Sequence, residues 1–330
     1  MNYIFGPVPS RRLGRSLGID PTPPADPLSL ARVGPYDRPR APKACNWNCV
    51  YCQLGPTRPF TRSRSLFFPP EALFAELREA MDSGLTDGVD WITFVGSGEP
   101  TLNKDLGVLI DGVKAVSQIQ IAVITNGSLL SFPEVRLELL GADAVMPTLD
   151  AGSPSLFRRI NRPPSEFGFE RHVEGLTAFR RAYTGKLWLE VMLVAGLNDG
   201  EAALRDLAAS IDRVAPDEVH LVLPTRPPSE AWVHPACEAA ILRTKEILSS
   251  VARVILPDER HGGFGNAWEE DHFATATSIV ERHPMSLGEL RTALVNWGAA
   301  DPDSIIRELV SLGKAIKVEH GGETFLRGRR

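Results

Sequence analysis

Three of the chain's four cysteines, Cys45, Cys49 and Cys52, lie within eight residues. Thiolates are soft ligands that suit zinc or iron–sulfur clusters. A structural zinc site usually takes four protein ligands, often from two C-x2-C pairs, but the fourth thiol, Cys237, lies 185 positions beyond Cys52. A cubane cluster held by three thiolates leaves one iron open to an exogenous ligand. The spacing C-x3-C-x2-C therefore favours an iron–sulfur site that binds a small molecule, and the alternative is a structural zinc site.

The elements that must position this loop read as a parallel sheet covered by helices. Near-continuous apolar runs alternate with amphipathic helical patterns in the order βαβαβα, as in parallel sheets. The predicted strands cover residues 91–95, 119–124, 144–149, 187–194, 219–223 and 254–256. The βα units number about six, too few for an eight-fold barrel. The sequence therefore predicts an α/β fold with a partial (β/α)6 barrel.

Polar or small residues follow the predicted strands. Gly96-Ser97-Gly98-Glu99-Pro100 follows the first, Thr125-Asn126-Gly127 the second and Asp150-Ala151-Gly152 the third. Because the carboxyl ends of parallel strands share one edge of the sheet, we expect these residues to form an active-site rim. Taken singly, Glu99 is also typical of a strand-end turn, and Asn126-Gly127 of a turn with glycine at positive φ.

The pattern changes near residue 275, where three helical stretches and a hairpin across Gly321-Gly322 follow. Ser286, with Glu289 three residues on, predicts a capping box at the second of these helices. We expect a barrel over residues 1–260, a linker over 261–274 and a winged-helix-like domain over 275–330. The alternative for this last region is a helical cap with a terminal hairpin.

Composition limits the classes of function. A net charge of -5 and a pI of about 5.9 give no global basic field for nucleic acid. From Asp271 onward, eight acidic residues balance eight lysines and arginines. No apolar run reaches the ~18–20 residues of a membrane span, and the N-terminus does not read as a secretory signal. Few cysteines, three of them clustered, favour a reducing cytoplasm over a disulfide framework.

The cysteine spacing, with aromatic Tyr51 just before the last cysteine, resembles the signature of the radical S-adenosylmethionine superfamily. The segment Gly96–Pro100 resembles that superfamily's GGEP-type motif. Further segments extend the likeness to the wyosine-synthetase-related (Fe-S oxidoreductase) branch over roughly residues 1–260; they are FGPVPSRRLGRSLG at 5–18, LDA at 149–151, RINRP at 159–163 and GLND at 196–199. The chain lacks the extra cysteines that a second cluster, as in the archaeal wyosine-synthesising enzymes, would need.

The resemblance implies an enzyme with a [4Fe-4S] cluster on Cys45, Cys49 and Cys52, whose open iron binds S-adenosylmethionine. Reductive cleavage would give a 5′-deoxyadenosyl radical that abstracts hydrogen from a substrate. The resemblance also implies the residues that bind this cofactor. The Tyr51 backbone and the segment 196–198, which includes Asn198, would lie beside the adenine, and Glu99 would contact the methionyl ammonium, with Gly98 allowing close approach. Asn126 and Asp150 would contact the methionyl carboxylate or the ribose.

The resemblance also implies a low-potential electron donor such as a flavodoxin or ferredoxin. A tRNA nucleoside or a polypeptide is the expected substrate, and Arg58, Arg62 and Arg64 are the local candidates for a tRNA-docking strip. Arg11, Arg12 and Arg15 are candidates for an anionic group at the barrel entrance. The alternative function is a metal- or redox-sensing winged-helix regulator that binds nucleic acid, which steep salt dependence of DNA binding would favour.

Overall fold

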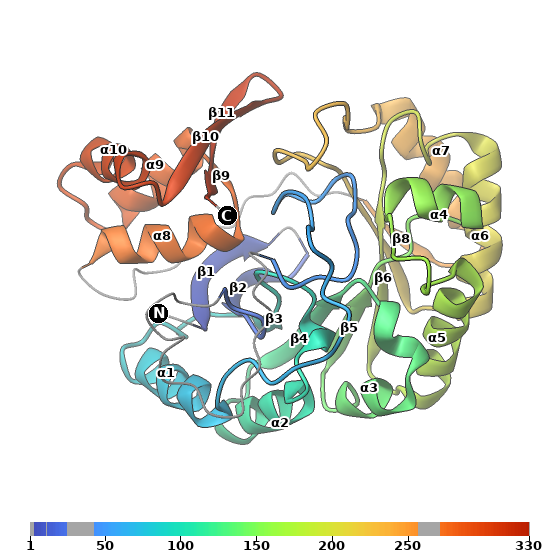
Figure 1. Cartoon of the computed structure of the whole chain (residues 1–330), viewed down its shortest axis with the longest axis horizontal. Helices are drawn as coiled ribbons and strands as arrows, with labels where there is room; N and C mark the ends of the chain where they lie inside the picture. The colour runs from blue at the N-terminus through green and yellow to red at the C-terminus, as the bar shows by residue number, and fades with distance from the viewer. Residues whose placement is uncertain (1–2, 11, 25–42, 257–270, 330) are drawn as a thin grey trace.

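The computed structural model describes residues 3–10, 12–24, 43–256 and 271–329. Its larger sheet has eight strands in chain order, and it curls into an open half-barrel (Figure 1). The strands are β1 (Ile4–Ser10), β2 (Gly14–Ile19), β3 (Trp91–Phe94), β4 (Gln120–Thr125), β5 (Ala144–Pro147), β6 (Lys186–Met192), β7 (Glu218–Val222) and β8 (Arg253–Ile255). β1 and β2 pair antiparallel, and the pairs from β2 to β8 are parallel.

Each strand from β2 to β7 is followed by at least one helix, so six βα units are present and the predicted partial barrel is confirmed. The helices are α1 (Pro70–Asp82), α2 (Leu106–Val116), α3 (Pro133–Glu138), α4 (Pro154–Ile160), α5 (Phe169–Ala182), α6 (Glu201–Val214) and α7 (Glu238–Leu248), with short 3-10 turns η2 (Pro100–Leu102) and η3 (Ser128–Ser131). α4 is an addition to the predicted helices.

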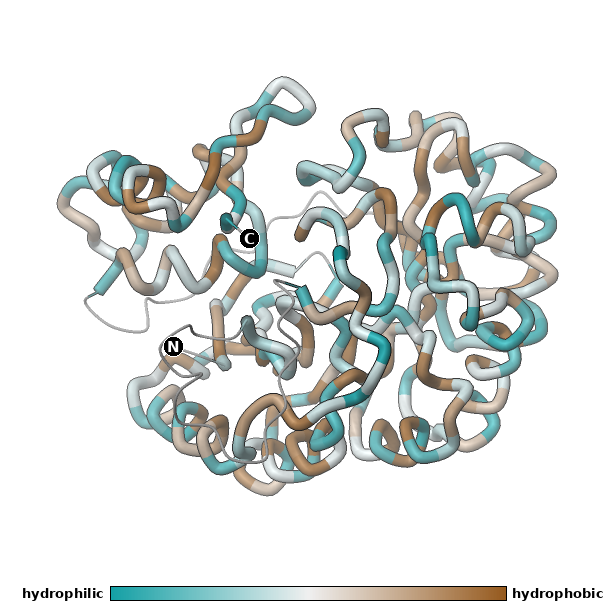
Figure 2. The backbone as a smooth tube through the Cα atoms, in the orientation of Figure 1, coloured by the Kyte–Doolittle hydropathy of each residue, from teal (hydrophilic) through white to brown (hydrophobic). Residues whose placement is uncertain are grey.

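The sheet forms because its central strands are apolar throughout and the helices cover them with one face. β3 and β5 are buried at every residue. α2 buries Leu106, Leu109, Ile110 and Val113, the face that its periodicity predicts. Hydrophobic and hydrophilic residues alternate along the covering helices (Figure 2). β1 is not predicted by periodicity, because Gly6, Pro7 and Pro9 interrupt its pattern.

The C-terminal elements form a second unit with its own core. They are α8 (His272–Arg282), β9 (Met285–Ser286), α9 (Leu287–Asn296), α10 (Pro302–Ser311), β10 (Ala315–His320) and β11 (Glu323–Gly328), with strand order β10-β11-β9. The predicted capping box at Ser286 is present. α8 begins inside the predicted linker, of which residues 261–270 lie outside the described ranges. The winged-helix assignment and the domain boundaries stay predictions.

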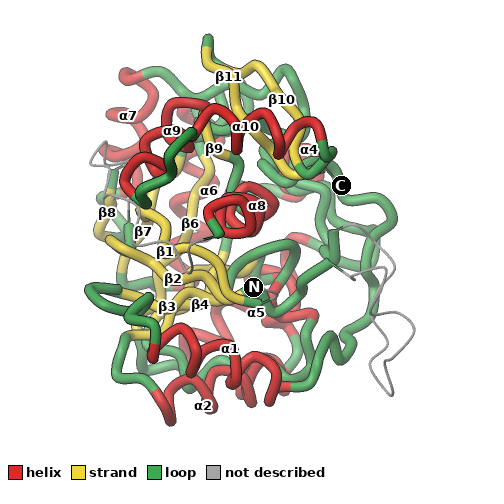
Figure 3. Tube along the Cα trace, turned by 90° about the vertical axis from the view of Figure 1, so that its left-hand side faces the viewer, coloured by secondary structure: helices red, strands yellow, loops and turns green. Residues whose placement is uncertain are grey.

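This C-terminal unit packs on the N-terminal hairpin. Val8 of β1 belongs to the C-terminal core, and Arg282 Nε donates to Asp20 Oδ2 at 2.8 Å in a pair with both side chains buried. Figure 3 shows the strands β1 to β4 in the middle, with α1 and α2 on one side and α8 on the other. Asp20 follows β2, so the contact fixes the C-terminal unit beside the strand ends.

No helix in the described ranges combines the length and the apolar content needed to cross a bilayer.

Candidate functional site

The residues between the cysteines hold their loop against the carboxyl ends of the strands. The buried Asn46 donates Nδ2 to Ser128 Oγ, just beyond β4, at 2.8 Å. The backbone N–H groups of Asn48 and Val50 donate to carbonyls at the end of α4 at 3.2 and 2.9 Å. The Val50 carbonyl accepts from the backbone N–H of Glu230, beyond β7, at 3.1 Å. The loop is therefore attached to three rim segments.

Each of the three sulfurs faces one side-chain N–H donor. The pairs are Lys43 Nζ with Cys52 Sγ at 3.3 Å, Asn161 Nδ2 with Cys49 Sγ at 3.7 Å, and Asn126 Nδ2 with Cys45 Sγ at 3.9 Å. The ammonium of Lys43 is buried and also donates to the Gly55 carbonyl at 2.6 Å. Donors of this kind stabilise anionic sulfur. Neither Lys43 nor Asn161 is predicted as a site residue, because each reaches its sulfur only through the fold.

Burial favours the protonated form of Cys45 and Cys49 by raising the pKa of each thiol. It raises the pKa of Cys45 from 9.0 to about 11, with Lys43 opposing this shift. It raises the pKa of Cys49 well above its ordinary value, and the neighbouring Cys52 and Cys45 raise that pKa further. The pKa values of Cys45 and Cys49 are each raised by other cysteines of the loop, so the three thiols lie near one another. Metal ligands must be thiolates, so loading the site releases protons.

Glu99 is fixed at the end of β3 by a set of donors. Its side chain is 2% exposed. Oε1 accepts from the Thr101 hydroxyl at 2.7 Å and from the Thr125 hydroxyl, and Oε2 accepts from the Asn126 backbone N–H at 2.7 Å. Burial raises the pKa of this carboxyl, and these hydrogen bonds oppose the shift. The carboxylate is therefore oriented by protein groups before any ligand binds.

Gly98 is required by close packing of the cysteine loop on the strand end. A Cβ added there would lie 1.9 Å from the Ala44 carbonyl oxygen. That same carbonyl accepts from the Glu99 backbone N–H at 2.8 Å. The absence of a side chain at Gly98 therefore lets the segment before Cys45 pack directly against the segment that carries Glu99.

Asp150, which follows β5, is hydrogen-bonded to the cysteine loop. Oδ2 accepts from the Tyr51 hydroxyl and from Asn161 Nδ2, each at 2.6 Å, and Oδ1 accepts from the Met192 N–H at 2.8 Å. Burial raises the pKa of Asp150 to about 6, and the three donors oppose this shift. Tyr51 therefore uses its hydroxyl to connect the cysteine loop to the β5 end.

Asn198 lies inside the loop that follows β6, and its side chain is 1% exposed. Its amide donates to the carbonyls of Asp150 and Met192 at 2.9 and 2.8 Å and accepts from the Val194 N–H at 2.8 Å. All of these hydrogen bonds are made with backbone groups. The structure therefore places Asn198 where it holds the loop beside Asp150.

The residues around the cysteines fit a bound iron–sulfur group. Several buried polar atoms in or against the loop have no hydrogen-bond partner in the described part of the chain; they are Trp47 Nε1, Thr57 Oγ1, Thr61 Oγ1 and Asn161 Oδ1. Buried polar groups are nearly always paired, so Asn161 Oδ1, on the amide that faces Cys49 Sγ, suits a polar occupant. Among the residues described, no three His, Cys, Asp or Glu side chains could hold one metal ion. A cubane takes each thiolate on a separate iron, so it does not need the sulfurs to close around one ion as zinc does.

Several of the predicted arginines have partners within the protein. Arg64 forms an ion pair with Glu138 and donates to backbone carbonyls, and Arg62 pairs with Glu166. Arg12 forms an ion pair with Glu190 of β6. The three-arginine docking strip stays a prediction: Arg58 is exposed, and the Arg62–Glu166 pair is a surface pair with side chains 63% and 41% exposed. Arg11 lies outside the described residues, and Arg15 donates to the Asp87 carbonyl at 3.3 Å.

A half-barrel with a three-cysteine loop at the carboxyl ends of its strands defines a class of iron–sulfur barrel enzymes. The sequence profile described as Radical SAM superfamily matches residues 42–208, about half of the chain. The chain belongs to the radical SAM superfamily. The likeness to its wyosine-synthetase-related branch rests on the motifs quoted above.

Three individual proteins are similar to this chain. The chain is 33% identical over 331 residues to UPF0026 protein MJ1312 of Methanocaldococcus jannaschii, covering 98% of this chain and 95% of that protein. It is 42% identical over 223 residues to a Brachyspira hyodysenteriae protein named GTPase Obg, covering 68% of this chain but 30% of the relative. The structure of a radical SAM methyltransferase from Sphaerobacter thermophilus matches with a TM-score of 0.50 at 18% identity, covering 64% of this chain and 63% of that one, and so shares the fold.

Membership settles the general chemistry. The protein is an iron–sulfur enzyme that binds a [4Fe-4S] cluster and S-adenosylmethionine. The zinc alternative is therefore not supported, and the comparisons do not support the regulator hypothesis. Cys237, at the start of α7, is exposed.

Proposed function

We propose that Cys45, Cys49 and Cys52 hold the cluster and that the enzyme uses S-adenosylmethionine to remove a hydrogen atom from a substrate at the rim. The observation that carries this proposal is the set of three sulfurs on one rim loop, each facing its own N–H donor. When bound on these cysteines, the cluster would supply the single electron that cleaves the sulfonium of S-adenosylmethionine and so starts hydrogen abstraction.

Glu99 and Asn126 bind the methionyl end of S-adenosylmethionine. Oε2 of Glu99 accepts one protein hydrogen bond, from the Asn126 N–H, and so keeps acceptor capacity for an ammonium group. Asn126 connects this carboxylate to the loop, because its Nδ2 donates to Asn46 Oδ1 at 2.8 Å and faces Cys45 Sγ. Asn126 thereby connects the Glu99 carboxylate to the cysteine loop.

Asp150 and the segment 196–198 bind the nucleoside end. The Asp150 carboxylate lies between the Tyr51 hydroxyl and the end of β6, so it is the acidic group available to ribose hydroxyls there. The Tyr51 backbone contacts the adenine. Asn198 acts as a positioning residue, since its amide holds the backbone of its own loop against Asp150. Trp47, 1% exposed and packed on Phe157, closes the inner side of the loop against water.

Anaerobic reconstitution tests the ligand assignment. The wild-type chain is expected to bind a cluster, to change its electron paramagnetic resonance signal when S-adenosylmethionine is added, and to release 5′-deoxyadenosine with dithionite. C45A, C49A and C52A should each lose the signal, whereas C237A, at the exposed thiol, should keep it. Full cluster loading in any of the first three variants contradicts the proposed ligand set.

A low-potential donor such as a flavodoxin or ferredoxin supplies the electron, since cleavage of the sulfonium needs a reductant. The reaction takes place in the cytoplasm, where the few cysteines of the chain stay reduced. The substrate is a nucleoside or a polypeptide. A hollow at the rim favours a nucleoside.

A further inference from the structure

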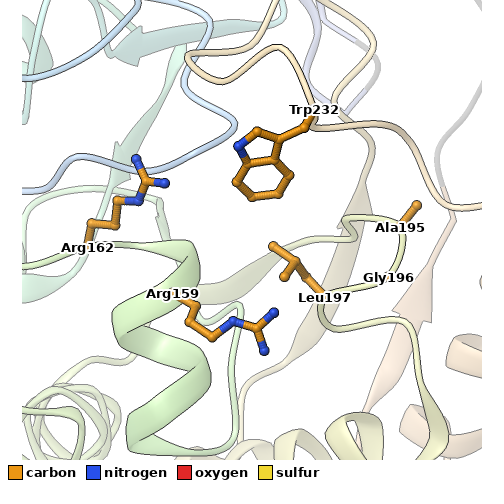
Figure 4. Close-up of a pocket in the computed structure, with 6 residues that line it drawn as sticks. All are labelled: Arg159, Arg162, Ala195, Gly196, Leu197 and Trp232. Atoms are coloured by element: carbon orange, nitrogen blue, oxygen red, sulfur yellow. The ribbon is translucent and has the colours of Figure 1, made fainter.

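A hollow of about 450 Å³ opens on the same rim, and residues 196 and 197 of its wall belong to the segment proposed to border the adenine. Its lining comes from three rim segments: Arg159 and Arg162 at the end of α4, residues 195–197 after β6, and Trp232 after β7. Figure 4 shows the Trp232 ring and both guanidinium groups around one space. A volume of this size is ordinary for a small-molecule site.

The walls of the hollow are attached to the cysteine loop. The Asn161 carbonyl, between the two arginines, accepts from the Asn48 N–H at 3.2 Å. Glu230, two residues before Trp232, donates its N–H to the Val50 carbonyl at 3.1 Å. A ligand in the hollow would therefore lie next to the proposed cluster site, as a substrate must.

The charges in the hollow favour an anion. The Arg162 guanidinium is paired with Glu230, but Arg159 is exposed and has no hydrogen-bond or ion-pair partner among the described residues. No acidic residue lines the hollow. One guanidinium is thus left uncompensated, and guanidinium groups bind phosphate oxygens in a bidentate manner.

The tryptophan adds a flat apolar surface. Trp232 is 49% exposed, although the next residue, Val233, is fully buried. Glu230 on the other side is held by Val50 and Arg162. The indole is therefore presented to solvent by a firmly anchored segment, which suits stacking on a planar ring.

We propose that this hollow binds the substrate and that the substrate is a nucleotide, with its base on Trp232 and its phosphate on Arg159. The proposal rests on the proposed function. The same chemistry is present in a free nucleotide and in a nucleotide of an RNA chain, so the two sources are separate arms of the test.

Calorimetry on the full, cluster-loaded chain with saturating S-adenosylmethionine tests this. The probes are GMP, guanosine, a short single-stranded RNA and N-acetyltyrosinamide. GMP is expected to bind about tenfold more tightly than guanosine, and R159M should remove that difference. W232A should weaken GMP about tenfold, while W232F should restore most of the affinity. R158M, at the neighbouring exposed arginine outside the hollow, and L242A, at an exposed leucine of α7, are the matched controls and should bind as wild type.

The outcomes distinguish an RNA substrate from a free nucleotide, and both of these from failure of the nucleotide assignment. Tighter binding of RNA than of GMP identifies an RNA substrate, and the reverse identifies a free nucleotide. If neither GMP nor RNA binds, or if N-acetyltyrosinamide binds more tightly, the nucleotide assignment is overturned. The proposed function then still holds if the enzyme releases 5′-deoxyadenosine. If W232A and R159M weaken S-adenosylmethionine as much as GMP, the hollow belongs to the cofactor and the assignment is overturned.

Discussion

Replacing Arg282 by methionine removes the buried ion pair with Asp20 that joins α8 to the end of β2. The Arg282 and Asp20 side chains are 4% and 0% exposed. The variant leaves the Asp20 carboxylate buried, with the Thr22 N–H at 3.0 Å as a remaining donor. Breaking a buried pair on one side costs about 3–5 kcal/mol of unfolding free energy, because the other charge is left uncompensated.

The expected loss for R282M is therefore about 3 kcal/mol or more, measured by equilibrium urea unfolding and by hydrogen exchange of the α8 amides. R291M is the matched control: Arg291 pairs with Asp303 in the same C-terminal unit, but their side chains are 53% and 52% exposed. An exposed pair of this kind is worth about 0–1 kcal/mol.

A double variant separates the charge from the packing. D20N/R282M removes both charges and should be about 1–3 kcal/mol more stable than R282M alone, since no buried carboxylate is left unpaired. If R282M loses no more stability than R291M, the pair does not hold the C-terminal unit on the barrel. If the double variant is as unstable as R282M, lost packing rather than charge is the cause.

Three further predictions concern the cysteine site and its surroundings. G98A should lose about 2 kcal/mol or more of unfolding free energy and bind less iron per chain, because its Cβ would meet the Ala44 carbonyl oxygen at 1.9 Å; wild-type loading would contradict this. Burial lowers the pKa of His172 from 6.5 to about 4, so the folded state keeps it neutral while the unfolded state takes up a proton below pH 6.5. Wild-type stability relative to H172Q should therefore fall by about 2 kcal/mol from pH 7 to pH 5, and a constant difference in urea titrations would refute this. K43M removes the ammonium beside Cys52 and should make the cluster harder to reduce in a redox titration read by electron paramagnetic resonance; an unchanged midpoint would exclude this role.

The rim was predictable because its signals are local. Parallel strands bring their carboxyl ends to one edge, so Glu99, Asn126 and Asp150 had to lie near each other once the strands were assigned. In the structure the Asn126 N–H donates to Glu99, and Asp150 accepts a hydrogen bond from Tyr51 of the cysteine loop. The alternation of apolar and polar runs was sufficient for this part of the fold.

The partners of individual side chains were not predictable, because they are set by contacts across long stretches of sequence. Asn161 reaches Cys49 across 112 positions, and Arg282 reaches Asp20 across 262. Arg64 reads as a surface cation, but Glu138, 74 positions away, pairs with it. A composition pattern cannot distinguish an arginine bound in this way from a free one such as Arg159.

The segment after β7 explains how the neutral C-terminal unit can matter to the site without binding nucleic acid itself. His320, at the end of β10, hydrogen-bonds the Pro224 carbonyl at 3.2 Å. Further along the same segment, Glu230 bonds the cysteine loop and Trp232 lines the hollow. One segment thus runs from the C-terminal unit to the proposed substrate site. The segment is therefore held by the C-terminal unit at Pro224 and by the cysteine loop at Glu230, and this connection needs no basic surface.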